Sequence, residues 1–242
     1  MAEELTTERP HVILVHGAAN SAAVWSFWQQ RLVNLGWRSH AIDLRGHGAG
    51  PPANLSITSM NDYADDVAEL AGRYSPEPIV VGWSMGGLVA LMVAARGLAS
   101  ACVGLAPSAP ARLLDETVPL RNGVFDSQEY GIVSPDPSDQ PAMPDLDAEE
   151  RAIALTSLAP ESRLARDERK RGILVRQLPC PLLIVTAEWE AERQRVTYDE
   201  LGLPAEYHRV EGCSHWGLVL NRRALDHLVP AVATWMSQTV RG

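Results

Sequence analysis

The chain has 242 residues, 46% of them hydrophobic, which is enough for one globular domain with a sizeable core. Its formal net charge of −9 argues against nucleic acid or an anionic membrane as a partner, because both bind basic patches. No apolar stretch is long enough to span a membrane, and the acidic N-terminus has no apolar core typical of a secretory signal. The three cysteines, Cys102, Cys180 and Cys213, lack the spacing of metal ligands and are odd in number, as is common in a reducing compartment. We therefore expect a cytoplasmic protein.

Strands and helices alternate along the first 105 residues. Apolar, β-branched runs predict four strands, at residues 11–15, 38–42, 78–81 and 101–105. Helical patterns between them predict three helices, at residues 21–35, 59–73 and 88–96. Ser59 and Asp62 resemble a capping pair at the start of the second helix. Strands that alternate with helices indicate a parallel sheet covered on both faces.

The alternation stops after residue 105. From residue 106 to about 177 the chain is polar and proline-rich, with two helices predicted near 147–158 and 161–175. Long segments of this kind in compact domains tend to be functional, although a solvated edge is the competing interpretation. Strands at 181–186 and 205–210 and a helix at 221–237 then complete the chain.

A serine lies between two glycines where the strand at 78–81 meets the following helix, in Gly82-Trp83-Ser84-Met85-Gly86. A strand that turns into a helix within a few residues must bend sharply, and glycines remove the side chains that would collide there. The bend presents the Ser84 hydroxyl, as in a G-x-S-x-G nucleophile elbow. The alternative is a glycine-rich helix start with a capping serine.

A serine hydroxyl is a weak nucleophile until a base removes its proton, and a third group must orient that base. His215 is the predicted base, because it lies in a glycine-containing loop between the last strand and the last helix. Glu188 and Glu190 are candidates for the acid, because they follow the strand at 181–186, and catalytic groups gather at that edge of a parallel sheet. Either glutamate can instead be a solvated loop carboxylate.

Backbone amides near Ser84 provide a candidate oxyanion hole. One amide is that of Met85, directly after the serine. The strand at 11–15 ends in His16-Gly17, and a tight turn there leaves the Ala18 amide as the second donor. The competing interpretation is that His16-Gly17 only ends a strand.

Four tryptophans lie within a few residues of these segments: Trp25, Trp83, Trp189 and Trp216. Aromatic side chains line many small-molecule pockets, so they predict a pocket for an apolar or aromatic acyl or alcohol group. Core packing is the alternative for each of them.

The His16-Gly17 strand end, the Ser84 elbow, the His215 loop and the segment 43–48 (Asp-Leu-Arg-Gly-His-Gly) are similar to those of the α/β-hydrolase superfamily, in its serine-nucleophile, esterase/lipase-like branch. The resemblance covers nearly the whole chain. It implies one α/β domain over residues 1–242, with a mostly parallel sheet of about six strands flanked by helices and with residues 106–177 as an inserted helical cap. Larger members begin with an antiparallel strand pair, for which the residues before the first strand leave no room.

The resemblance also implies a function. Relatives often end the penultimate strand in G-x-x-D; Ala187 and Glu190 occupy these positions here, so Glu190 is the first choice for the acid and Glu188 the second. We expect a carboxylesterase-like serine hydrolase that cleaves a small ester or lactone through an acyl-enzyme on Ser84, with no metal or organic cofactor. The alternatives are a C–C hydrolase or lyase with the same triad and a non-catalytic, ligand-binding member of the fold.

Overall fold

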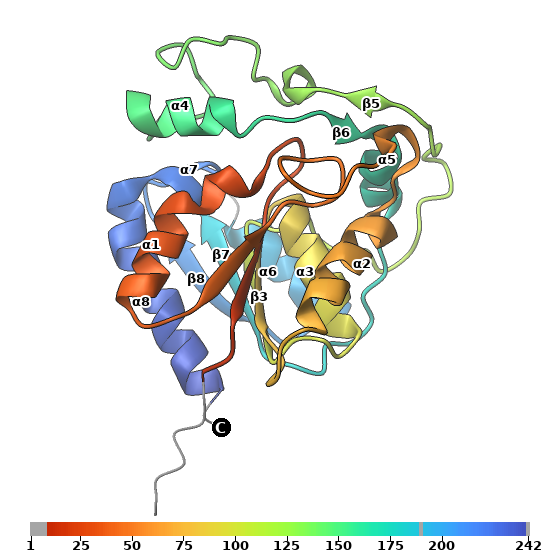
Figure 1. Cartoon of the computed structure of the whole chain (residues 1–242). Coiled ribbons are helices and arrows are strands. Elements are labelled where there is room, and N and C mark those ends of the chain that lie inside the picture. The colour runs from red at the N-terminus through yellow and green to blue at the C-terminus, as the bar shows by residue number, and fades with distance from the viewer. Residues whose placement is uncertain (1–8, 189–190, 241–242) are drawn as a thin grey trace, which may run out of the picture.

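A computed structural model describes residues 9–188 and 191–240 of the chain, with backbone alone at 191–193. Its centre is a sheet of six parallel strands in the order β2-β1-β3-β4-β7-β8 (Figure 1). The strands are β1 (Val12–Val15), β2 (Ser39–Ile42), β3 (Ile79–Trp83), β4 (Ala101–Leu105), β7 (Leu182–Ala187) and β8 (Glu206–Val210). The predicted α/β class and the six-stranded parallel sheet are confirmed.

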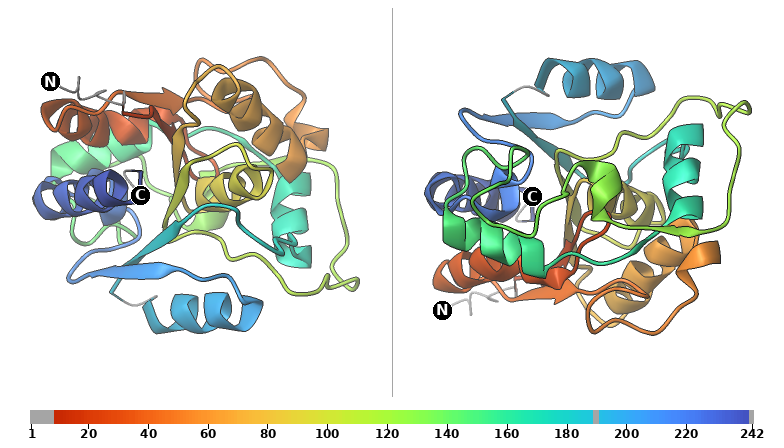
Figure 2. Two further views of the ribbon diagram at one scale, coloured as in Figure 1. Left: turned by 90° about the horizontal axis from the view of Figure 1, so that it is seen from below. Right: turned by 90° about the horizontal axis from the view of Figure 1, so that it is seen from above.

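Helices cover both faces of the sheet (Figure 2). One layer contains α1 (Ser26–Asn34), α7 (Gly217–Leu220) and α8 (Arg222–Thr239); the other contains α2 (Met60–Ala71), α3 (Met85–Ala95) and α6 (Ala191–Leu201). Side chains alternate along β1 between these layers: Val12 and Leu14 pack with α1 and α8, whereas Ile13 and Val15 pack with α2 and α3. Because the central strands are buried on both faces, they are apolar throughout.

The helix ends follow local rules that the sequence shows only in part. Ser59 and Asp62 form the expected capping box: the Ser59 amide donates to Asp62 Oδ2 at 2.8 Å and the Asp62 amide donates to Ser59 Oγ at 3.2 Å. The helix predicted at 21–35 is divided into a 3-10 turn, η1 (Ala22–Trp25), and α1. The sequence analysis did not predict α6 or the 3-10 turn η2 (Leu55–Ile57).

The segment between β4 and β7 lies over the carboxyl ends of the strands (Figure 1). It contains β5 (Val124–Phe125), the 3-10 turn η3 (Ser127–Tyr130), α4 (Ala148–Thr156), β6 (Glu161–Ser162) and α5 (Arg163–Arg171), and β5 pairs with β6 in a second, antiparallel sheet. Two helices were expected here, but the second begins at Arg163, because Glu161 belongs to β6. It ends before Gly172, whose φ of +115° is not helical.

In the part of the chain that the structure describes, no helix is both long and apolar enough to cross a membrane.

Candidate active site

Ser84 lies at the bend between β3 and α3 in a backbone conformation that few residues adopt. Its φ is +56° and its ψ is −118°, a strained conformation for a residue with a side chain. The bend is fixed from both sides: the Ser84 amide donates to the Leu105 carbonyl at 3.0 Å, and its carbonyl accepts from the amide of Ser108 at 2.8 Å. A Cβ at Gly82 would overlap the Gly86 carbonyl, so the elbow needs glycine there.

A cavity of about 250 Å³ opens beside this bend. Ser84 and His215 both line it, although they are 131 positions apart in the sequence. Residues 211–216, which carry His215, form the loop between β8 and α7, called here the histidine loop. Trp83 holds this loop against the elbow, because its Nε1 donates to the His215 carbonyl at 3.0 Å and its ring lies 5.2 Å from the His215 ring. The other residues of the wall are mainly apolar: Ala18, Ala19, Asn20, Ser127, Tyr130, Ile132, Ala142, Leu158, Arg169 and Trp216.

The turn after β1 lies directly against the elbow. A Cβ on Gly17 would lie 2.8 Å from the Trp83 ring and 3.2 Å from the Ser84 Cβ, so only glycine allows this approach. Ala18 lines the cavity, and Met85 is the first residue of α3, where amides have no acceptor within the helix. The backbone hydrogen bonds of the described residues include none from the Ala18 or Met85 amides. Both therefore remain available to an oxygen bound next to Ser84.

A buried carboxylate from the insertion supports this turn from behind. Glu161 is fully buried, and its Oε2 accepts from the Ala19 amide at 3.0 Å, where Ala19 has a φ of +57°. The same oxygen lies 3.5 Å from Nε2 of His47, and Oε1 accepts from the Tyr63 hydroxyl at 2.6 Å. A carboxylate with three such partners is compensated for its loss of water.

These contacts set the charges of the cluster. Burial alone raises the pKa of Glu161, but His47, Tyr63 and the Ala19 amide outweigh burial and lower it to about 2. Burial alone lowers the pKa of His47, because it disfavours the charged form, yet the contact with Glu161 leaves the pKa of His47 raised. His16 differs, because burial and the neighbouring His47 lower its pKa to about 4. The contact with Glu161 thus favours the charged form of His47, whereas His16 beside it favours the neutral form.

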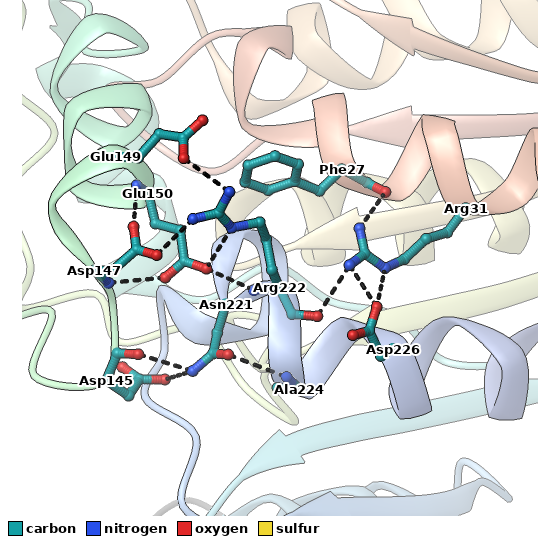
Figure 3. Close-up of polar contacts among 10 residues, drawn as sticks. All are labelled: Phe27, Arg31, Asp145, Asp147, Glu149, Glu150, Asn221, Arg222, Ala224 and Asp226. Atoms are coloured by element: carbon teal, nitrogen blue, oxygen red, sulfur yellow. Dashed lines mark hydrogen bonds and ion pairs between the residues drawn. The ribbon is translucent and has the colours of Figure 1, made fainter.

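Asp145, also in the insertion, holds the histidine loop. Its Oδ2 accepts from the Ser214 amide at 3.0 Å. The same oxygen accepts from the side chain of Asn221 at 3.1 Å (Figure 3). A Cβ on Gly217 would overlap this carboxylate, so the loop needs glycine at that position. The insertion therefore contacts both the turn after β1 (residues 16–19) and the histidine loop.

The acid candidates are placed less completely. Glu190, the first choice, and Trp189 lie outside the described residues. Glu188, the second choice, follows β7; its Oε2 accepts from the Gly212 amide at 3.0 Å and its Oε1 lies 3.4 Å from Arg209. These contacts brace the start of the histidine loop.

Of the four tryptophans expected in the pocket, Trp83 and Trp216 line the cavity. Trp25 needs a correction: it is fully buried in the core, edge-to-face with Trp28 at 5.7 Å, because η1 turns it toward the sheet. The sequence analysis also missed residues of the site that come from the insertion, namely Glu161, Asp145, Tyr130 and Arg169. Only Glu161 carried a local signal, and that signal pointed to a helix start.

No group of three or more His, Cys, Asp or Glu side chains among the described residues is arranged to hold a metal ion.

Comparison with known proteins agrees with this architecture. The model of the "Alpha/beta hydrolase family" matches residues 12–226, and the chain belongs to this family. A pyrethroid hydrolase of Sphingobium wenxiniae is 38% identical over 76 residues, which are 31% of this chain and 27% of that protein. A pimeloyl-acyl-carrier-protein methyl ester esterase of Nitrosomonas europaea is 36% identical over 92 residues, which are 38% of this chain and 34% of that protein. These matches thus span about a third or less of each curated relative.

Among solved structures, polyneuridine aldehyde esterase superimposes with a TM-score of 0.72 at 16% identity, over 93% of this chain and 100% of that chain. This likeness extends the shared fold to almost the entire chain, including the insertion.

Proposed function

We propose that the protein is a serine hydrolase that cleaves a small carboxylic ester or lactone through an acyl-enzyme on Ser84. The observation that carries this proposal is the strained backbone of Ser84, at φ +56°, on the wall of a cavity that it shares with His215 and Ala18. Strain of this kind is kept where the surrounding structure over-determines it, and it clusters at functional sites. The curated relative from N. europaea, named as a methyl ester esterase, supports the choice of reaction.

In the proposed mechanism His215 takes the proton of the Ser84 hydroxyl while the serine oxygen attacks the ester carbonyl carbon. The carbonyl oxygen becomes an oxyanion, and the Ala18 and Met85 amides donate hydrogen bonds to it. His215 then gives its proton to the leaving alkoxide, the C–O bond breaks, and an alcohol departs. Water repeats the cycle on the acyl-enzyme and releases the acid. Glu190, with Glu188 as second choice, orients His215 in this proposal.

Two further features of the structure support this mechanism. The N-terminus of α3 adds a partial positive charge beside the Met85 amide, which favours the oxyanion. The small volume of the cavity, about 250 Å³, and its mainly apolar wall favour a short ester.

The direct test is replacement of the proposed nucleophile. Ser84→Ala is expected to abolish hydrolysis of short p-nitrophenyl esters, by about 10³-fold or more in kcat, with an unchanged melting temperature. A fluorophosphonate probe should label the wild type and not the variant. Unchanged ester hydrolysis in Ser84→Ala would overturn the proposal. A lyase would show no acyl-enzyme burst with activated esters, and a ligand-binding member would show neither labelling nor turnover.

A further inference from the structure

One cation lines the proposed active-site cavity. Arg169 of α5 reaches the cavity from the insertion, and the remaining wall of the cavity is apolar or neutral apart from His215. Its Nη2 donates to the Tyr130 hydroxyl at 2.9 Å, and Tyr130 lines the same cavity. The Nε of Arg169 is buried and has no hydrogen-bond partner among the described residues. Among the described residues the Arg169 guanidinium thus donates to the neutral hydroxyls of Tyr130 and Ser108.

The other arginines on the same face of α5 do have a carboxylate partner. Arg163 and Arg166 both pair with the carboxylate of Glu129. Arg169, three residues further along the helix, has no ion pair with a carboxylate among the described residues. Glu161, a buried acid of the insertion, is already occupied by His47, Tyr63 and the Ala19 amide.

An unpaired cation at a mainly apolar wall costs free energy unless a ligand compensates it. In a chain with a net charge of −9, carboxylates to pair with it are abundant, yet no carboxylate of the described residues forms an ion pair with it. A ligand that enters the cavity therefore meets a fixed positive charge and a tyrosine hydroxyl that still has its own proton to donate.

One residue, Ser108, contacts both Arg169 and Ser84. Arg169 Nη1 lies 3.4 Å from Ser108 Oγ, and the Ser108 amide donates to the Ser84 carbonyl at 2.8 Å. Because Arg169 and Ser84 line one small cavity, a single short molecule touches both.

We propose that Arg169 and Tyr130 bind a carboxylate of the substrate, so that the preferred substrates are short esters carrying one free carboxylate a few bonds from the scissile carbonyl. This inference rests on the proposed function for the identity of the reacting group. The carboxylate can stand on the acyl side, as in a half-ester of a dicarboxylic acid, or on the alcohol side, as in an acylated hydroxy acid.

The test compares esters that differ only in this charge. Monomethyl glutarate is compared with dimethyl glutarate for the acyl side, and 4-acetoxybutanoate with its methyl ester for the alcohol side. For one of the two pairs, the wild type is expected to show a kcat/KM at least about ten-fold higher for the charged ester. The preferred pair identifies the side that carries the carboxylate, and the preference should fall at high salt.

Two variants assign the preference to Arg169. Arg169→Gln is expected to lower kcat/KM for the charged ester at least about ten-fold more than for its neutral partner. Lys170→Gln removes the same charge from the next position of α5, where the side chain is exposed and outside the cavity, and should keep the wild-type ratio. Equal kcat/KM within both pairs, or a preference that survives in Arg169→Gln, would overturn the inference.

Binding separates this inference from the proposed reaction. In Ser84→Ala, which has no proposed nucleophile, the affinity for each charged ester and its neutral partner is measured by calorimetry. Tighter binding of a charged ester, lost in the Ser84→Ala, Arg169→Gln double variant, supports the carboxylate site even if the wild type hydrolyses no ester. Equal affinities within both pairs contradict the site whatever the reaction.

Discussion

Several acidic side chains fasten the insertion between β4 and β7 to the rest of the molecule, and two of these places differ in their access to water. At one, Glu161 is completely buried beside the turn after β1, residues 16–19, which is the proposed oxyanion turn. At the other, Asp147 and Glu149 at the start of α4 pair with Arg222 of α8, and their side chains are 53% and 68% exposed (Figure 3). The same residue types thus act in two very different environments.

The difference determines what each contact contributes. An ion pair in water gains little, because solvent screens it and two long side chains lose freedom. A buried carboxylate cannot exchange its partners for water, so losing one of them leaves an uncompensated group. Only the buried contact also reaches a residue of the proposed oxyanion turn, Ala19. We therefore expect Glu161 to link the insertion to catalysis and Arg222 to serve mainly as a surface fastening.

Removal of the buried carboxylate should have the largest effect. Glu161→Ala leaves the His47 ring, the Tyr63 hydroxyl and the Ala19 amide without their common acceptor, at a cost of about 3–5 kcal/mol in unfolding free energy. Loss of the bond to Ala19 also loosens the turn that presents the Ala18 amide, so kcat should fall while KM changes less. Urea unfolding and ester kinetics measure the two effects.

Glu149→Gln is the matched control, because it removes an acid from the same insertion at an exposed position. It should leave kcat unaffected. If Glu161→Ala unfolds at the same urea concentration as this control and keeps its kcat, the buried contact has no special role. Should the alanine variant fail to fold, Glu161→Gln keeps the shape and is expected to show the fall in kcat on a folded protein.

The stability contributed by the buried pair of Glu161 and His47 should depend on pH. The lowered pKa of Glu161, about 2, means that its contribution is present above the ordinary carboxyl range and is lost as the pH falls toward 2. The raised pKa of His47 means that its contribution is complete below the ordinary histidine value and is lost as the pH rises through the raised one. The pair should therefore stabilise the protein most between about pH 4.5 and 6.5.

Unfolding free energies of the wild type and Glu161→Gln, measured from pH 4 to 9, test this. His16, with its pKa of about 4, acts in the opposite direction below pH 6.5, since the unfolded chain binds its proton first. The difference between wild type and variant, rather than either curve alone, isolates the pair. A difference that stays constant from pH 6 to 9 would show that His47 carries no charge in the folded protein.

The contrast between the two places also explains how much of the molecule the sequence predicts. The strands, the capping box at Ser59 and the elbow at Ser84 depend on neighbours within a few positions, and their residue patterns indicate them directly. Apart from the adjacent Ser162 amide, the partners of Glu161 lie at Ala19, His47 and Tyr63, and Ala19 and Tyr63, which hydrogen-bond to it, are 142 and 98 positions away. No local pattern encodes such a contact, and an acid before a helix is more readily interpreted as a helix start.

Arg169 and Asp145 were missed for the same reason. Arg169 lies in a run of basic residues, Arg-Asp-Glu-Arg-Lys-Arg, in which nothing distinguishes the one side chain that reaches the cavity. Asp145 belongs to a proline- and aspartate-rich loop that is typical of a solvated segment, yet it holds the amide of Ser214. The insertion is thus the least predictable part of the fold and the part that supplies most of the unexpected residues of the site.

The smallest effect is expected at the exposed place. Arg222→Gln breaks the ion pairs with Asp147, Glu149 and Glu150. The buried Glu150 still accepts from the Arg222 amide at 2.8 Å and from the Asp147 amide at 2.8 Å, and α8 keeps its start. Because water replaces the lost partners, the melting temperature should fall by at most about 2 °C, and kcat/KM should stay within about two-fold of the wild type. High salt should remove the difference between wild type and variant, since it screens exposed charges. A fall in stability as large as that of Glu161→Ala, persisting in 1 M salt, would show that exposure does not separate the two places and that Arg222 also fastens the insertion over the cavity.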